Sequence, residues 1–126
     1  MLNQHELVAN LAVKDLAAAQ AFYEDTLGLQ LVAEEGDMLL VFQTGASRLF
    51  VYQSEFAGSN RATAATWVVG DAIEAETQQL KAKGVRFEHY AGLPDLRIEG
   101  DLHIGDGVKI AWFKDPDGNI LSLVSG

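Results

Sequence analysis

The stretch NLAVKDLAAAQAFYEDTLGLQL, residues 10–31, decides the fold, because its pattern returns once more in the chain. The second copy is TWVVGDAIEAETQQLKAKGVRF, residues 66–87. At a constant offset of 56 residues, Asp15 falls on Asp71 and Gly28 falls on Gly84, with no gap between the copies. A repeat of this kind indicates that one supersecondary unit is used twice.

Each copy predicts a strand, a helix of about 11 to 13 residues and a second strand. The aspartates are predicted to cap the helix N-termini, and the glycines to end the helices. Further strands are predicted at residues 29–34, 38–43, 48–53, 109–114 and 119–124. The glycine-rich residues 90–107 predict a loop or lid over one mouth of the sheet. The sequence therefore predicts an α+β fold of two tandem βαβββ modules, about 5–56 and 61–126, in a single domain of residues 1–126.

The composition limits the classes of function. The chain has 126 residues, of which 48% are apolar and 21% are charged, the balance of a globular protein. No apolar run is long enough to cross a membrane and no signal-peptide pattern is present, so we expect a cytoplasmic protein. Without cysteine, a catalytic or metal site must use histidine, carboxylate or hydroxyl groups. The net charge of −9 disfavours nucleic-acid and membrane partners and favours a cationic small molecule.

Three motifs carry a resemblance to a known family: LAVKDL at residues 11–16, AFYEDTLGL at 21–29 and FKDPDGN at 113–119. Their order and spacing resemble the vicinal-oxygen-chelate superfamily, which includes glyoxalase I, extradiol dioxygenases, fosfomycin-resistance enzymes and bleomycin-resistance proteins. The resemblance implies curled mixed sheets that form a cleft, and a homodimer. For the enzymes of the family, it also implies a divalent metal held by His, Glu or Gln side chains on the first and last strands of the modules.

The metal-ligand positions implied by this resemblance are occupied by Val8, Phe50, Ala64 and Ser122. Valine, phenylalanine and alanine offer no donor atom, and a serine hydroxyl does not replace imidazole or carboxylate. We therefore expect no metal and no other cofactor. For the same reason we discount lactoylglutathione lyase and ring-cleaving dioxygenase activity, which depend on the metal in this family.

Strand alternation predicts which side chains face the cleft. The predicted ligand-binding residues are Val8, Asn10, Phe50, Tyr52, Thr66, Trp112 and Ser122. This set is mostly apolar and aromatic, which is typical of a small-molecule site. We therefore predict that the protein binds or sequesters a small aromatic or cationic molecule, in the manner of a bleomycin-resistance protein.

The alternative is an enzyme, namely a glyoxalase-related lyase, isomerase or dioxygenase that acts on a small organic substrate. Its candidate catalytic residues are His89, which flanks the predicted lid, and His103, which lies within it. Carboxylates near them in sequence are Glu88, Asp95, Glu99 and Asp101. A histidine beside one of these carboxylates would form a general acid–base pair. The competing interpretation is that both histidines are exposed loop residues. Catalysis needs such a group of ionisable side chains, whereas sequestration does not.

Overall fold

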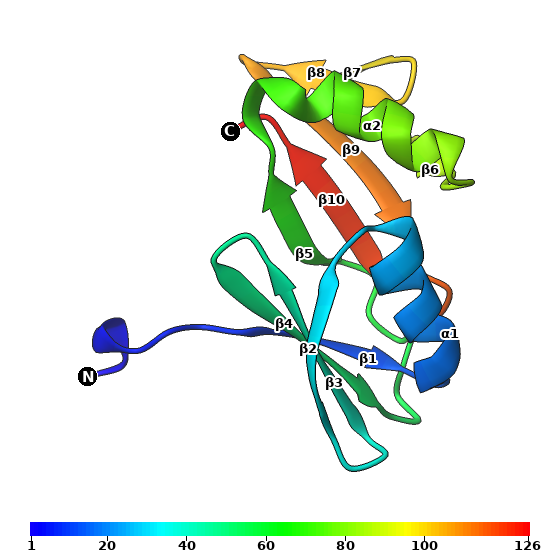
Figure 1. The fold of residues 1–126 in the computed structure, drawn as a ribbon. Helices are drawn as coiled ribbons and strands as arrows, with labels where there is room; N and C mark the ends of the chain where they lie inside the picture. The colour runs from blue at the N-terminus through cyan, green and yellow to red at the C-terminus, as the bar shows by residue number, and fades with distance from the viewer. The chain divides into compact units, whose positions relative to one another are not determined.

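The computed structural model describes residues 1–126, which divide into two compact units. Unit 1 is Met1–Ser59 and unit 2 is Asn60–Gly126. Each unit has one mixed sheet and one main helix (Figure 1). The predicted α+β fold of two βαβββ modules is confirmed. None of the helices has the length and apolar character that a membrane-spanning helix requires.

Unit 1 is a four-stranded sheet in the order β1-β4-β3-β2, in which β1 and β4 are parallel and the other pairs antiparallel. Its helix α1 packs on β3 and β4 and continues as a π-helical segment, η2. The N-terminal arm, with the short helix η1, extends away from the sheet (Figure 1). In chain order, the elements are η1 (Leu2–Gln4), β1 (Ala9–Val13), α1 (Leu16–Gln20), η2 (Ala21–Thr26), β2 (Gln30–Glu35), β3 (Leu39–Thr44) and β4 (Ser47–Gln53).

Unit 2 repeats this plan, with β5 parallel to β10 and β10 antiparallel to β9. Its sheet has the order β5-β10-β9-β8-β7, and the short strand β6 also pairs with β9. In chain order, the elements are β5 (Thr63–Val68), η3 (Gly70–Ala72), α2 (Ile73–Ala82), β6 (Phe87–Glu88), β7 (Arg97–Glu99), β8 (Leu102–Gly105), β9 (Val108–Lys114) and β10 (Ile120–Val124).

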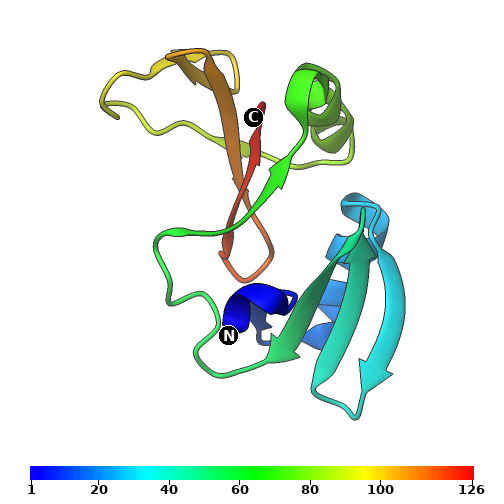
Figure 2. The same cartoon turned by 90° about the vertical axis from the view of Figure 1, so that its left-hand side faces the viewer.

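The two units differ along one sheet edge. In unit 1, the single strand β2 accompanies β3, whereas in unit 2 the strands β6 and β8 share one edge of β9. Phe87 of β6 lies opposite Phe113, and His103 of β8 lies opposite Ile110. In Figure 2, part of the intervening segment (residues 89–101), drawn in yellow, extends beyond β9 on the side away from α2, and the segment returns to α2 at Asp101, which pairs with Lys81. The edge strand of unit 2 is therefore interrupted by an excursion that unit 1 lacks.

The prediction of a loop or lid over residues 90–107 is wrong in part, because this segment contains β7 and β8. The two strands have only 3 and 4 residues, too few for alternation to be recognised. Pairing with β9 supplies the backbone hydrogen bonds that hold β8 in place. The chain just before β7 also packs closely against β8, because a Cβ added at Gly105 of β8 would clash with the backbone oxygen of Asp95.

The helix caps differ between the two copies of the repeat. Asp15 caps α1 as predicted, because its Oδ1 accepts hydrogen bonds from the backbone N–H groups of Ala17 and Ala18 at 2.9 and 3.2 Å. The predicted cap at Asp71 is wrong: α2 begins after Ala72, and no side chain caps it. Gly70, at φ +60°, starts a 3-10 turn that contains Asp71, so the carboxylate is not at the cap position.

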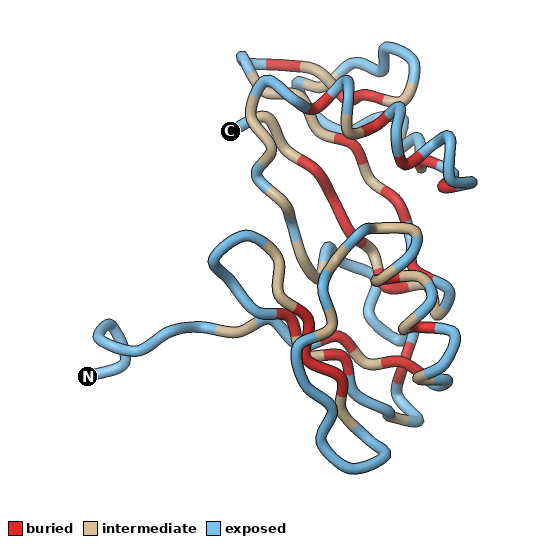
Figure 3. Tube along the Cα trace, viewed as in Figure 1, coloured by how far each residue is buried: buried red, intermediate tan, exposed pale blue.

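Alternation along the strands places the core of each unit between its sheet and its helix. In unit 1, Val13, Val51 and Phe42 are fully buried, and the Phe42 ring contacts that of Tyr23 in η2. In unit 2, the buried Phe113 stacks on Trp67, so these two rings lie on the same face of the sheet. Figure 3 shows the buried residues along the central strands and the exposed ones in the turns and the N-terminal arm. The opposite faces carry the predicted cleft residues.

Candidate functional site

The predicted cleft residues of unit 1 lie on the sheet face opposite α1. Asn10 of β1 is the neighbour of Phe50 on β4, so the register places Asn10, rather than Val8, beside the last-strand position. Val8 precedes β1, and its carbonyl oxygen accepts a 3.5 Å hydrogen bond from Asn10 Nδ2. Phe50 is half-buried, and Tyr52 is 39% exposed. Unit 1 therefore offers an amide and two aromatic rings on this face.

Three predicted residues of unit 2 lie in one row across the sheet: Thr66 on β5, Ser122 on β10 and Trp112 on β9. The Thr66 Oγ1 and Ser122 Oγ atoms are 2.7 Å apart and hydrogen bond to each other. Ser122 is buried, so its hydroxyl is satisfied within the protein. Thr66, rather than Ala64, is the first-strand neighbour of Ser122, which matches the place of Asn10 in unit 1.

The residues at these positions do not fit a divalent metal. The facing pairs are Asn10 with Phe50 and Thr66 with Ser122, and none of them carries an imidazole or a carboxylate. Nowhere in residues 1–126 do three or more His, Asp or Glu side chains gather in a way that could hold a metal ion. Amide and hydroxyl oxygens without a charged ligand would not offset the dehydration of such an ion.

A pocket of about 690 Å³ opens beside Trp112, wholly within unit 2. It lies between the start of β5, the segment that follows β6, and the ends of β9 and β10. Its size falls within the range of small-molecule sites, about 300 to 1,000 Å³. The lining residues are Arg61, Ala62, Thr63, His89, Tyr90, Ala91, Leu93, Trp112 and Ile120.

Trp112 is held rigidly at this pocket. Its indole Nε1–H donates a 3.0 Å hydrogen bond to Thr63 Oγ1. The centroid of its ring lies 5.3 Å from that of Tyr90 and 4.7 Å from that of His103, and both ring pairs have T-shaped geometry. Contacts of this kind add about 0.5–1.5 kcal/mol each beyond the burial of area. One face of the pocket is therefore an aromatic wall whose orientation is fixed before any ligand arrives.

The sequence reasoning identified Trp112 but missed Tyr90, Leu93 and Arg61. Tyr90 and Leu93 fall in the segment that was predicted as a loop, where alternation does not assign faces. The pairing of β6 indicates that Tyr90 is near Trp112, because Glu88 lies opposite Trp112 and Tyr90 follows Glu88 by two residues. Burial raises the pKa of the Tyr90 phenol, with a further contribution from the Glu88 charge, so the ring stays neutral.

His103 is not an exposed loop residue, and it does not reach solvent. Its side chain is completely buried, and its Nε2 accepts a 2.8 Å hydrogen bond from the Tyr90 backbone N–H. Burial lowers the pKa of His103, and the nearby Ile110 backbone raises it by a smaller amount. The other ring nitrogen, Nδ1, has no partner with hydrogen-bond geometry. His103 is therefore a neutral residue that supports Trp112 and Tyr90.

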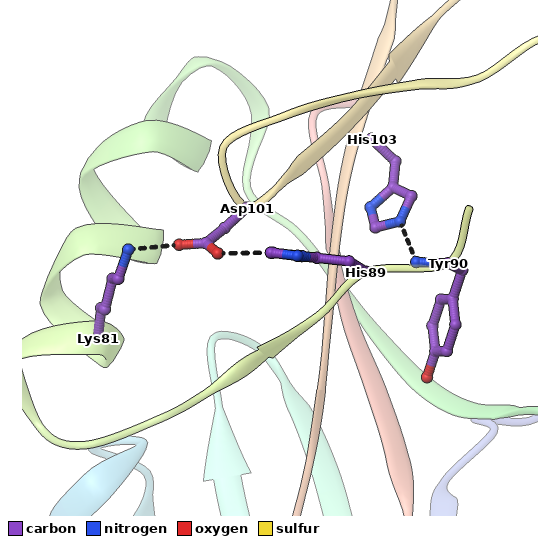
Figure 4. Close-up of polar contacts among 5 residues, drawn as sticks. All are labelled: Lys81, His89, Tyr90, Asp101 and His103. Carbon is purple, nitrogen blue, oxygen red and sulfur yellow. Dashed lines mark hydrogen bonds and ion pairs between the residues drawn. The ribbon is translucent and has the colours of Figure 1, made fainter.

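His89 pairs with Asp101, one of the carboxylates that the catalytic alternative named. His89 Nε2 lies 2.9 Å from Asp101 Oδ1, and Lys81 Nζ of α2 lies 2.7 Å from Oδ2 (Figure 4). The hydrogen bond from Lys81, followed by that from His89, holds the pKa of Asp101 below its usual value. The ionised carboxylate can only accept, so Nε2 of His89 is the donor of this hydrogen bond, and His89 is one of the residues that line the pocket.

Comparison with known proteins identifies the family of the fold. A family model described as the Glyoxalase/Bleomycin resistance protein/Dioxygenase superfamily matches residues 5–123. A search of curated proteins finds no significant match.

Several solved structures share the fold at low sequence identity. A bleomycin resistance determinant encoded on the transposon Tn5 has a TM-score of 0.70 and 24% identity, over 97% of this chain and 98% of that chain. An antibiotic binding protein from Streptomyces sp. CB03234 has a TM-score of 0.66 and 23% identity, over 94% and 93%. The fosfomycin resistance protein FosX from Listeria monocytogenes has a TM-score of 0.70 and 19% identity, over 97% and 90%.

Proposed function

The chain belongs to the Glyoxalase/Bleomycin resistance protein/Dioxygenase superfamily, and from that premise we propose that it binds a small planar aromatic molecule without a metal. The observation that carries this proposal is the pocket of about 690 Å³ beside Trp112. Two structures of similar fold are a bleomycin resistance determinant and an antibiotic binding protein, which supports the binding of a small molecule as a role. The homodimer implied by the family resemblance stays a prediction.

The chemistry of the pocket supports binding of a flat ring. Tyr90, Leu93 and Trp112 provide apolar surface, and the hydrogen bond from Trp112 to Thr63 fixes the indole. A preorganised wall lowers the entropy cost of binding, because the Trp112 side chain does not have to be ordered when the ligand arrives. A ring stacked on the indole would remove apolar area from water and gain the attraction between aromatic faces.

Fluorescence titration with naphthamide, an uncharged aromatic amide, tests this proposal. The chain has 2 tryptophans, so a Trp67→Phe background leaves Trp112 as the only indole reporter. We expect quenching that saturates. The Trp112→Ala variant has no reporter, so its affinity is measured by letting it compete with the reporter protein for naphthamide. Trp112→Ala should bind naphthamide about 30-fold more weakly, which corresponds to about 2 kcal/mol for a central aromatic contact. Phe56→Ala, an exposed aromatic residue of unit 1 outside the predicted binding set, is the matched control. Unchanged affinity of Trp112→Ala would refute the assignment of the pocket.

A second candidate function, metal-free acid–base catalysis, is favoured by one observation, the His89–Asp101 pair at the pocket. In such a reaction, Nδ1 of His89 would take a proton from a carbon next to a carbonyl group of the substrate, and Asp101 would stabilise the imidazolium. His103 has no such role, because it is buried and its Nε2 already accepts from Tyr90.

Proton exchange of acetonaphthone in deuterated water, followed by NMR, separates catalysis from simple binding. Catalysis predicts methyl-group exchange that is faster than in buffer, abolished in His89→Ala and retained in His5→Ala. His5 is an exposed residue before β1 and serves as the control. Exchange at the buffer rate, or acceleration that survives in His89→Ala, would exclude this function for His89.

A further inference from the structure

We propose that the ligand of the Trp112 pocket carries an anionic group beside its aromatic ring and that Arg61 binds this group. The inference rests on the proposed function and specifies its ligand class. The net charge of the chain, −9, favours a cation, but the side chains at the pocket itself have the opposite sign. Short-range contacts at the site, rather than distant surface charges, decide the sign of the bound group, since salt screens exposed charges beyond about 8 Å.

The ionisable residues that line the pocket are Arg61, His89 and Tyr90, and no carboxylate is among them. The Tyr90 phenol is neutral because burial raises its pKa. His89 is neutral or positive, and its Nε2 is directed to Asp101. The charge presented by the lining residues is therefore positive, and it comes first from the guanidinium of Arg61.

Two carboxylates next to the pocket residue His89, one bonded to it and one beside it in sequence, already have cationic partners. Asp101 binds Lys81 as well as His89, and Glu88 lies 3.2 Å from Lys114 Nζ. Arg61 takes part in none of the ion pairs of the chain. An unpaired guanidinium at the rim of an aromatic pocket is suited to a carboxylate, sulfonate or phenolate oxygen, which it can bind through two parallel N–H groups.

The backbone around Arg61 is fixed by its neighbour in sequence. The Asn60 side chain forms two hydrogen bonds to Ala62: Oδ1 accepts from the backbone N–H and Nδ2 donates to the backbone oxygen, both at 3.1 Å. These bonds hold residues 60–62 in a tight loop directly before β5. The backbone of Arg61 therefore has a fixed position at the pocket, and of this residue only the side chain must be ordered when an anion binds.

Three probes with one ring system test the inference: naphthoate, an anion; naphthamide, which is neutral; and naphthylmethylammonium, a cation. Their affinities are measured by Trp112 fluorescence in the Trp67→Phe background at about 0.15 M salt. We expect naphthoate to bind about fivefold to tenfold more tightly than naphthamide, the scale of a partly exposed charged contact, and the cation to bind most weakly.

The variants assign this preference to one residue. Arg61→Gln should make naphthoate and naphthamide bind equally, whereas Arg86→Gln should leave their order unchanged. Arg86 is exposed and absent from the pocket, so it controls for the loss of one positive charge. A preference for naphthoate that survives in Arg61→Gln would overturn the role of Arg61.

The outcomes separate this inference from the proposed function. The anion preference would be overturned if naphthoate and naphthamide bound equally, or if the cation bound most tightly. If Trp112→Ala also abolished this binding, the result would still support the aromatic pocket. Failure of all three probes to bind would overturn the aromatic pocket and the anion preference together.

Discussion

Replacement of the buried His103 should destabilise unit 2 far more than replacement of His89, although both histidines occur in the segment after β6. His103→Ala leaves the Tyr90 backbone N–H without its acceptor, which costs about 1–3 kcal/mol. It also removes the T-shaped contact with Trp112, about 0.5–1.5 kcal/mol, and opens a cavity that adds about 1 kcal/mol.

Part of this loss is offset. In the native protein, Nδ1 of His103 is buried without a hydrogen-bond partner, so its removal restores about 1–2 kcal/mol. The net expectation is a loss of about 2–3 kcal/mol in the free energy of unfolding. His103→Gln, which keeps an acceptor for Tyr90, should lose about 1 kcal/mol. His89→Ala should lose less than about 1 kcal/mol, because its side chain is 51% exposed in the pair with Asp101.

Urea denaturation followed by circular dichroism gives these free energies, with an unchanged slope taken as evidence that the unfolded state is the same. If His103→Ala fails to fold, His103→Gln still provides the comparison with His89→Ala. A loss below about 0.5 kcal/mol for His103→Ala, or an equal loss for His89→Ala, would contradict the structural role assigned to His103.

Three further predictions follow from the contacts described above. Burial lowers the pKa of His103, so as pH falls below about 6.5 the unfolded state takes up a proton before the folded state does. The free energy of unfolding should therefore drop by up to about 1.4 kcal/mol per pH unit. The same urea series on His103→Gln should lack this pH dependence. Asp15→Ala should reduce the thermal stability by about 1 kcal/mol, whereas Asp71→Ala should stay within about 0.5 kcal/mol of the parent. Elemental analysis of the dialysed protein should find no stoichiometric divalent metal; one tightly held ion per chain would show that a ligand set other than the family positions exists.

The sequence predicted β4 and β9, in which buried and more exposed residues alternate, and β3 and β10, which are short apolar runs with turn residues at their ends. It failed for β7 and β8, because β7 is ordered by pairing with β8, and β8 by pairing with β9, rather than by a pattern of their own. The same tertiary pairing buries His103, so the expectation of an exposed loop histidine was wrong.

The candidate site shows the same limit. Trp112 could be predicted because its face follows from its position in β9, and His89 could be paired with a carboxylate only as one of several possibilities. Tyr90 and Arg61 lie outside regular strands, where no periodicity assigns a direction to the side chain. Asp71 matches Asp15 in the repeat, but the turn begun by Gly70 changes its position relative to the helix.

The interrupted edge of β9 separates the residues that set the sheet register from those that line the Trp112 pocket. β6 and β8 hold β9 at its two ends, while Tyr90 and Leu93 belong to the excursion between them. Changes of length or composition in that excursion can alter what the pocket admits without moving a single β9 partner. Unit 1 keeps one strand along this edge, whereas in unit 2, under the proposed function, exchange of the excursion would change the ligand and leave the sheet in place.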